Sequence, residues 1–407
     1  ILSALEAGRT GRRAARPLGM VDHPRRLAGA PFPRRKCARP LKDRVDHIRR
    51  RRLKPRISRK FGNAGHVLQH ETLLGDGRGV GHALLSNGCN KLRGAIARDL
   101  MDTNSPLRTE IRPYSETAIA EAARLIGEGQ CVAVPTETVY GLAADATNGA
   151  AVARIYAAKG RPSFNPLIVH VPDMEMAESI AVFNAEARAL AARYWPGPLT
   201  LVLPLRSDSR IAGIVTAGLP TIAIRLPAHP AMQALLRAAA RPLAAPSANA
   251  SGSISPTRAE HVAKSLDGRI PLIVDAGPTA VGLESTIVAV DGGALRLLRP
   301  GPVDLGLALS SDGSIEAPGQ LASHYAPSKP LRLNAVSIQP DEWLIGFGDI
   351  ACDANLSPAA DLTEAAARLF DLLHQADASD RPRIAITPIP SGGLGDAIND
   401  RLQRAAA

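Results

Sequence analysis

Apolar residues first recur at helical spacing just after Ser115, where organised patterning of the chain begins. The positions that define this first helix are Ala118, Ile119, Ala122, Leu125 and Ile126. Because residues three and four apart share one helix face, they predict an amphipathic helix that ends at Gly127 and Gly129. Later periods predict helices at 150–159, 186–195, 230–238 and from Ser255-Pro256-Thr257 to about 266, and strands at 131–134, 167–171, 199–205, 221–225, 243–245, 272–275, 285–290 and 295–298.

A change in composition separates a second domain from the first. Arg299-Pro300-Gly301-Pro302 opens a stretch rich in Gly, Ser and Pro that extends to Pro330 and is typical of a linker. Beyond it we expect a strand near 344–347, a helix at 362–375, a strand at 383–387 and a helix at 395–404. The chain therefore divides into an extension (1–104), a mixed α/β domain with a twisted sheet (105–302), a linker (303–330) and a small Rossmann-like, three-layer α/β domain (331–407).

The excess positive charge of the chain lies in the extension. The formal net charge of the chain is +11, which at first suggests a nucleic-acid partner. Residues 1–100 hold 24 Lys and Arg against 7 Asp and Glu, whereas the remaining residues hold 25 against 31. The patterned part of the chain is therefore acidic, and we expect it to bind tRNA weakly or not at all.

The extension has clusters such as Arg49–Arg52 and no sustained apolar period, so we expect it to be largely disordered. It fits an unstructured tail translated upstream of a native start at Met101. A basic arm that grips RNA and a targeting peptide are the alternatives.

Cysteine spacing and hydropathy exclude several classes of protein. Cys37, Cys89, Cys131 and Cys352 form no C-x-x-C pair, so neither a zinc ribbon nor a disulfide framework is indicated. No apolar run approaches the ~18 residues of a membrane span. We expect a cytoplasmic protein with no membrane partner and no metal held by its own side chains.

Polar and charged side chains gather where the predicted helices and strands end, which is where α/β proteins place their sites. Lys159-Gly160-Arg161 ends a helix, where two cations could bind a polyphosphate or could complement the helix dipole. Ser247 and Asn249 follow a strand. Ser255 precedes a helix, where its hydroxyl could bind phosphate or ribose or act as an ordinary N-cap.

Three further positions are ambiguous or have an ordinary structural interpretation. Ser285, in Glu284-Ser285-Thr286, could line a polar pocket or belong to a plain turn, and His170 at the end of an apolar strand suits a buried core histidine. Arg299 could bind a phosphate or lie in water. Taken singly, these residues fix no reaction.

The order of these motifs is more informative than any one of them. Eight blocks follow one another: PTETVYGL; AKGRP with NPLIVHV; WPGPLTLVL; TAGLP with IAIRLPAHP; APSANASGSISPT; GLESTIV; LLRPGP; and SHYAP. Together they resemble the YrdC-like threonylcarbamoyl-AMP synthase family, in its long form with a C-terminal domain. The resemblance extends from about residue 115 to the C-terminal end of the sequence.

The resemblance implies an enzyme that joins L-threonine, bicarbonate and ATP into threonylcarbamoyl-AMP and releases pyrophosphate. The product would pass to a tRNA threonylcarbamoyl transferase complex, which modifies the adenosine at tRNA position 37. Mg²⁺ would arrive with ATP.

The resemblance also implies roles for particular residues. Lys159 and Arg161 match the catalytic K-x-R pair. The positions that match threonine contacts are Thr138, His170, Arg225 and Ser285. The positions that match ATP contacts are Lys159, Arg161, Asn165, Thr216, the backbone of Ala245, Ser247, Asn249, Ser255, Arg299 and Tyr325. Since Tyr325 belongs to the linker, we expect the linker to cover the nucleotide as a lid, with Gln320 at a position where an apolar residue is expected.

Two alternatives use the same kind of domain. One is a double-stranded RNA-binding module, which the acidic charge of the patterned region disfavours. The other is the carbamoyl-transfer enzyme of hydrogenase maturation, which also carries paired-cysteine zinc fingers that this sequence lacks.

Overall fold

The computed structural model describes residues 107–162, 164–310 and 315–407. The predictions made for the extension, including its disorder and a start at Met101, lie outside the described residues. Among those that are described, no helix combines the length and apolar character needed to cross a membrane.

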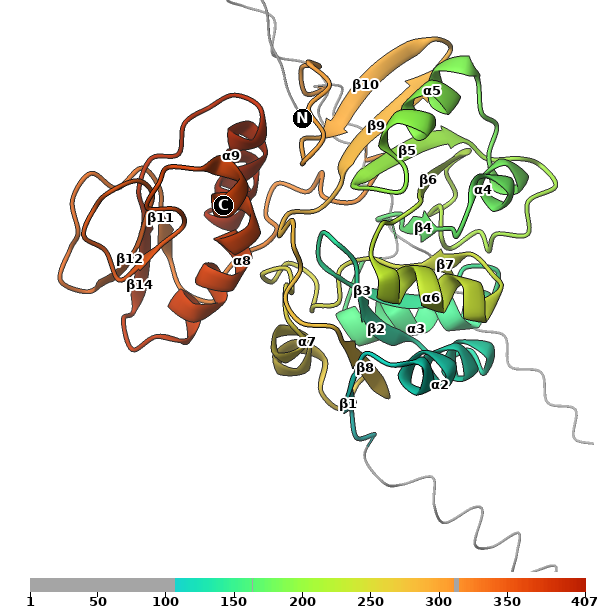
Figure 1. The fold of residues 1–407 in the computed structure, drawn as a ribbon, viewed down its shortest axis with the longest axis horizontal. Coiled ribbons are helices and arrows are strands. Elements are labelled where there is room, and N and C mark those ends of the chain that lie inside the picture. Colours follow the sequence, from blue (N-terminus) through green and yellow to red (C-terminus); the bar gives the residue numbers. More distant parts are fainter. Residues whose placement is uncertain (1–106, 163, 311–314) are drawn as a thin grey trace, which may run out of the picture. The chain divides into compact units, whose positions relative to one another are not determined.

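The large domain is built on a mixed sheet whose strands come in the spatial order β1-β8-β2-β3-β7-β4-β6-β5-β9-β10 (Figure 1). The strands are β1 Glu110–Pro113, β2 Val132–Pro135, β3 Tyr140–Asp145, β4 Ile168–His170, β5 Leu199–Pro204, β6 Thr221–Arg225, β7 Leu243–Ala244, β8 Leu272–Asp275, β9 Thr286–Asp291 and β10 Ala294–Arg299. The sheet contains both parallel and antiparallel pairs, which confirms the predicted mixed α/β class.

The pairing of the strands brings together side chains that line the candidate site. β4 and β6 are parallel and end side by side, with His170 opposite Arg225. β5 runs antiparallel to β6 and parallel to β9, so the starts of β5 and β9 lie at the same edge as these two ends. Side chains that are distant in sequence therefore meet at one edge of the sheet.

Helices cover both faces of this sheet. They are α2 Glu116–Gly127, α3 Gly149–Lys159, α4 Met174–Ile180, α5 Ala185–Tyr194, α6 Pro230–Ala239 and α7 Ala259–Leu266. α2 and α6 share one apolar core with β2 and β8, in which Ile126 and Leu235 are fully buried. The other helices belong to a second core with Ile155 and Val262. Each fully buried Leu or Ile contributes about 1.5–3 kcal/mol to folding, so two cores hold the sheet from both sides.

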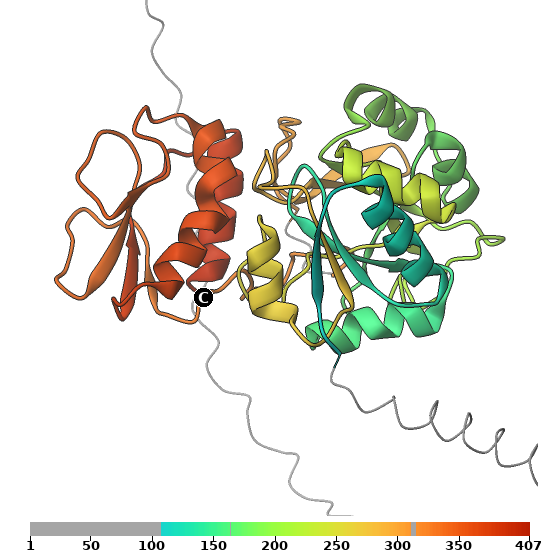
Figure 2. The ribbon, with the colours of Figure 1, turned by 60° about the horizontal axis from the view of Figure 1, so that its bottom comes forward.

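The C-terminal domain has a parallel sheet in the order β11-β14-β12-β13, formed by β11 Leu331–Arg332, β12 Glu342–Gly346, β13 Ala354–Asn355 and β14 Arg383–Ile386. α8 Leu362–Ala378 and α9 Leu394–Ala405 lie on one face of it, and loops stand where the third layer was expected (Figure 2). The core under these helices also takes in Val139, Leu283 and Tyr325, so it continues into the large domain and the linker.

The structure departs from the predicted elements in two instructive places. β3 was not predicted, because YGLAAD has little β-branched character, yet all six of its residues are buried. The helix expected to open at Ser255-Pro256-Thr257 begins instead at Ala259, with Arg258 as its N-cap. Ser255 is therefore not an N-cap, and Pro256 does not occupy the first helical position. The strands β1, β11 and β13 and the helix α4 were also not predicted.

Gly160 turns the chain between Lys159 and Arg161 because it takes the left-handed conformation at the end of α3, with φ of 59°. A Cβ there would meet nothing within 4 Å, so an added methyl group would cause backbone strain only. We expect Gly160→Ala to lower the free energy of unfolding by about 1–2 kcal/mol. Gly127→Ala is the matched control, since Gly127 also has open space but no positive φ, and it should raise stability by about 0.5 kcal/mol. Denaturant titration of both variants measures the two effects; equal changes would contradict the assignment of strain to Gly160.

Candidate active site

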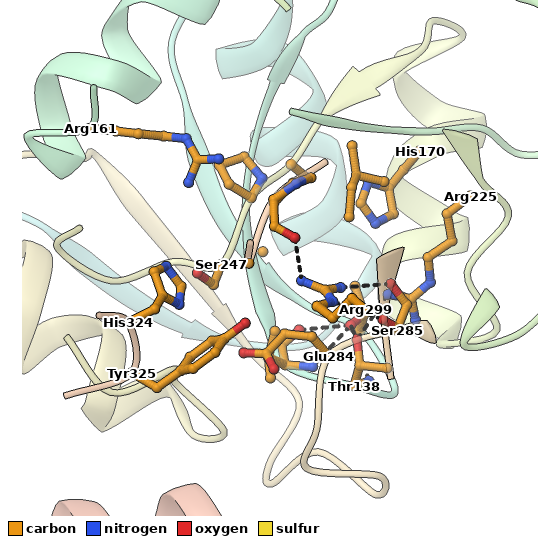
Figure 3. Close-up of a pocket in the computed structure, with 18 residues that line it drawn as sticks. Thr138, Arg161, His170, Arg225, Ser247, Glu284, Ser285, Arg299, His324 and Tyr325 are labelled. Carbon is orange, nitrogen blue, oxygen red and sulfur yellow. Dashed lines mark hydrogen bonds between the residues drawn. The ribbon is translucent and has the colours of Figure 1, made fainter. Parts of the chain in front are cut away.

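A cavity of about 50 Å³ lies at the sheet edge where β4 and β6 end. Its walls come from the β2–β3 turn, these strand ends, the segment before β9 and the linker (Figure 3). The residues predicted from the sequence that line it are Thr138, Arg161, His170, Arg225, Ala245, Ser247, Ser285, Arg299 and Tyr325. The structure thus brings together side chains from both the expected amino-acid side and the expected nucleotide side.

Arg225 is held firmly on one side of the cavity. Its guanidinium donates to Gly197 O at 3.1 Å, to Thr138 Oγ1 at 2.9 Å and to Glu137 Oε1 at 2.6 Å. Burial alone would raise the pKa of Glu137, but the charge and hydrogen bond of Arg225 outweigh it and lower that pKa. Three of the five N–H groups of Arg225 thus have partners among the described residues, which leaves two for an incoming carboxylate.

Hydroxyl groups border Arg225. Thr136 and Thr138 share a hydrogen bond of 2.8 Å, and Thr136 Oγ1 also donates to Val139 O, so their tight turn is fixed by its own side chains. Ser285 also lines the cavity, and its Oγ lies 2.7 Å from Thr200 Oγ1 and accepts from Arg299 at 3.0 Å. This corner can satisfy a carboxylate and a hydroxyl at once.

His170 lies beside Arg225 and is only 3% exposed. Burial, with a smaller contribution from the charge of Arg225, lowers its pKa to about 3. Its Nδ1 atom has no hydrogen-bond partner among the described residues. The imidazole is therefore neutral at physiological pH and suits a polar contact better than proton uptake.

Two buried arginines form the other side of the cavity. Arg161 donates to Asn165 O and Pro166 O, and burial lowers its pKa to about 10, which still leaves it charged near pH 7. Arg299 donates to Ser285 O and Ser285 Oγ at 3.0 Å. Both cations are held mainly by neutral oxygens, so their positive charge is not cancelled.

Lys159 occupies a place that the sequence did not indicate. Its ammonium donates to Ser247 O at 2.6 Å and to Asn249 O and Oδ1, and it does not line the cavity. Burial, and then the charge of Arg161, lowers its pKa well below the usual value. In this conformation Lys159 positions the loop of Ser247 and Asn249, which neither the phosphate nor the helix-dipole interpretation foresaw.

The remaining predicted nucleotide residues do not line the cavity either. Thr216 Oγ1 donates to Gly213 O at 3.2 Å, and Asn249 Nδ2 donates to Ser253 O at 2.7 Å. Ser255 Oγ donates to Glu284 Oε1 at 2.5 Å. Asn165 is 1% exposed, and its Oδ1 has no hydrogen-bond partner among the described residues.

The linker forms one wall of the cavity. Tyr325 has φ of 65° and is 1% exposed. Its hydroxyl lies near Arg299 but makes no hydrogen bond of good geometry within the described residues. Gly319 lies against both, because a Cβ there would come within 2.8 Å of Arg299 Cδ and 2.9 Å of Tyr325 OH. Gln320 accepts the backbone N–H groups of Glu316 and Ala317, so it closes a turn where apolar packing was expected.

Several residues that line or support the cavity were not among the predicted site residues. Glu284 and His324 line the cavity, and Glu137 fixes Arg225. Glu284 and His324 stand inside motifs that were noticed for their neighbours. Arg401 contacts Glu284 from α9, and nothing in its local sequence sets it apart from a solvated helix residue.

Two family models match this chain. The family model Sua5_yciO_yrdC, described as telomere recombination, matches residues 124–301, and the model described as threonylcarbamoyl-AMP synthase, C-terminal domain, matches residues 288–407. The threonylcarbamoyl-AMP synthase of Bacillus subtilis is 42% identical over 72% of this chain and 94% of its own length. That of Pyrococcus abyssi is 38% identical with the same coverage.

A solved structure adds the fold. The crystal structure of P. abyssi Sua5 complexed with L-threonine superposes with a TM-score of 0.67 at 36% identity, over 74% of this chain and 97% of that one. Relatives of this identity match nearly their whole length here, C-terminal domain included. The chain therefore belongs to the threonylcarbamoyl-AMP synthase family, whose members are enzymes of the nucleotidyltransferase type.

Proposed function

We propose that this chain joins L-threonine, bicarbonate and ATP into threonylcarbamoyl-AMP and pyrophosphate. The observation that carries the proposal is a single cavity with two different walls. One wall pairs Arg225 with Thr138 and Ser285, and the other presents Arg161 and Arg299. The names of the relatives and the threonine-bound P. abyssi structure support it.

The first wall suits an amino acid that carries a hydroxyl group. The two remaining N–H groups of Arg225 would bind the threonine carboxylate, as a planar guanidinium does with two parallel bonds. Thr138 and Ser285 would bind its side-chain hydroxyl. His170 would complete the pocket as a neutral polar group.

The second wall suits the nucleotide. A carbamate formed from threonine and bicarbonate would attack the α-phosphorus through its oxygen, and pyrophosphate would leave. Negative charge then gathers on phosphate oxygens, where Arg161 and Arg299 would stabilise it without forming a covalent enzyme intermediate. Asn165 and Tyr325 would contribute their unpaired oxygens to ATP.

We expect Mg²⁺ to enter bound to ATP and to be held mainly by its phosphates. No group of three or more His, Cys, Asp or Glu side chains in the described parts of the chain could hold a metal ion. Glu284, the acidic residue that lines the cavity, is already bonded to Ser255 and Arg401. Mg²⁺ would neutralise the charge of the phosphates. The phosphates would supply most of its oxygen ligands in place of protein side chains, as they do in many kinases.

Two downstream consequences belong to the same proposal. The adenylate would pass to a tRNA threonylcarbamoyl transferase complex, with the synthase acting in the cytoplasm. The acidic balance of the patterned region supports weak or no direct contact with tRNA.

The small volume of the cavity supports a lid. One water needs roughly 10–15 Å³, so about 50 Å³ holds a few waters and no nucleotide. The segment with Gly319, His324 and Tyr325 would therefore have to move aside for ATP to enter and return to cover it.

The reaction itself is the first test. The full chain, given ATP, Mg²⁺, bicarbonate and labelled L-threonine, should release pyrophosphate and form labelled threonylcarbamoyl-AMP, and serine should replace threonine poorly. We expect Lys159→Ala to abolish this release while the protein still folds, because the loop of Ser247 and Asn249 loses its anchor. Circular dichroism provides the folding control. Near-normal turnover by Lys159→Ala would remove it from the catalytic machinery, and no adenylate from the wild type would refute the function.

The role of His170 has a pH signature. Its pKa is lowered to about 3, with Arg225 and Glu137 beside it, so the folded state stays neutral where the unfolded state takes up a proton below about 6.5. The stabilisation that neutral His170 gives to the folded state is thus fully present above pH 6.5 and is lost as pH falls toward 3. Relative to His170→Gln, the wild type should lose unfolding free energy between pH 6.5 and 5, measured by denaturant titration. Both proteins should show kcat/KM profiles without an inflection near 6.5; an inflection confined to the wild type would make His170 a base.

If the linker covers ATP as proposed, a substitution of Tyr325 should change the ATP affinity without changing the free energy of unfolding. Because the Tyr325 hydroxyl makes no good hydrogen bond in this conformation, Tyr325→Phe should leave stability unchanged and weaken ATP binding about tenfold. Tyr140→Phe is the matched control, since its hydroxyl donates to Gly277 O at 2.7 Å. That variant should lose about 1 kcal/mol of stability and keep its ATP affinity. Calorimetric ATP titration decides, and unchanged affinity in Tyr325→Phe would argue against contact with ATP.

A further inference from the structure

Arg401 is a completely buried arginine that reaches the site from the C-terminal domain. It belongs to α9 and is 0% exposed. Its guanidinium donates to Glu284 Oε2 at 2.8 Å, to Asp400 Oδ2 at 2.7 Å and to Pro300 O at 3.0 Å. Since Glu284 lines the cavity and Pro300 follows Arg299, a residue near the end of the chain contacts both sides of the nucleotide wall.

The lid tyrosine rests on the same guanidinium. The Tyr325 ring lies with its centroid 5.3 Å from Arg401 Cζ and 5.6 Å from the ring of Phe370 in α8. Tyr325 and Glu284 lie close together in the cavity (Figure 3). Arg401 therefore supports the lid and the carboxylate together.

The negative charge of Glu284 would oppose the binding of a nucleotide. Although burial favours its neutral form, the charges of Arg401 and Arg299 outweigh that effect and lower its pKa, so it carries a negative charge. A free carboxylate on this wall would repel phosphates, or it would pair with Arg299 and cancel the charge that phosphates need. In the structure Glu284 does neither, because its two oxygens are taken by Ser255 and Arg401.

We propose that Arg401 is a positioning residue that holds Glu284 away from Arg299 and so keeps Arg299 available to ATP. The inference rests on the proposed function for the identity of the ligand. It assigns the C-terminal domain a direct part in nucleotide binding, through one charge pair. It also explains why Arg299 donates to Ser285 and to Pro318 O and not to the nearby carboxylate.

The test removes the pair one charge at a time in the full chain. Arg401→Met should weaken ATP binding about tenfold or more, since Glu284 then turns to Arg299, and should leave the KM for threonine little changed. Adding Glu284→Gln removes the released charge, so the double variant Arg401→Met/Glu284→Gln should recover most of the ATP affinity. Arg401→Lys keeps a charge with fewer contacts and should fall in between.

Arg258→Met is the matched control, because Arg258 pairs with Asp371 of α8 at 2.7 Å and joins the same two domains without touching Glu284. It should bind ATP as the wild type does. If Arg258→Met weakens ATP binding as much as Arg401→Met, or if Glu284→Gln gives no rescue, Arg401 only holds the domains together and the inference is overturned. Should Arg401→Met fail to fold, the double variant and Arg401→Lys decide by the same criterion.

Calorimetric titration with ATP alone is the readout, alongside pyrophosphate release. ATP binding that responds as described in a protein that forms no threonylcarbamoyl-AMP would refute the proposed function and uphold this inference. Adenylate formation with ATP affinity indifferent to Arg401 would do the reverse.

Discussion

The site depends on the burial of positive charge. Five cationic side chains around one cavity are each less than a tenth exposed: Lys159, Arg161, Arg225, Arg299 and Arg401. Removing a charge from water is costly unless the protein supplies partners, so each cation dictates the loops around it. The backbone carbonyls of 165–166, 197, 247, 249, 285 and 300 all point toward these groups.

The choice of partner divides the cations into two kinds. Arg225 and Arg401 are paired with the carboxylates Glu137 and Glu284, which neutralise them. Arg161 and Arg299 are held by carbonyl and hydroxyl oxygens, which orient a guanidinium without cancelling its charge. A polyanion gains most from the second kind, whereas an amino acid, with one charge of each sign, suits a paired arginine that keeps free donors. The type of buried partner thus distinguishes Arg225, on the wall proposed for the amino acid, from Arg161 and Arg299, on the wall proposed for the nucleotide.

Much of this architecture was predictable from the pattern of the sequence, and the failures have physical causes. Long periodic segments such as α2 and α6 were predicted within about two residues, because burial of one face decides them. β3 was not predicted, because its burial in the tertiary structure outweighs the weak strand propensity of its residues. The N-cap interpretation of Ser255 was wrong, because its hydroxyl does not accept from a helix N–H but donates to the buried, ionised Glu284 in a charge-assisted hydrogen bond. Arg401 could not be found, since only the assembled fold brings α9 to a carboxylate 117 positions earlier.

Polar atoms in the cavity and behind its walls have no hydrogen-bond partner within the described residues. Asn165 Oδ1, His170 Nδ1, His324 Nδ1 and the Tyr325 hydroxyl are buried without good partners. A ligand that supplies partners to these atoms would gain about 0.5–1.5 kcal/mol for each hydrogen bond. The linker is held beside them by the apolar and aromatic packing of Tyr325 on Phe370 and Arg401, together with the core shared by Val139, Leu283 and α8. The C-terminal domain therefore holds Tyr325 in a position where its hydroxyl and the neighbouring polar atoms face a ligand, because the packing that fixes the ring is apolar and leaves the polar end to the site.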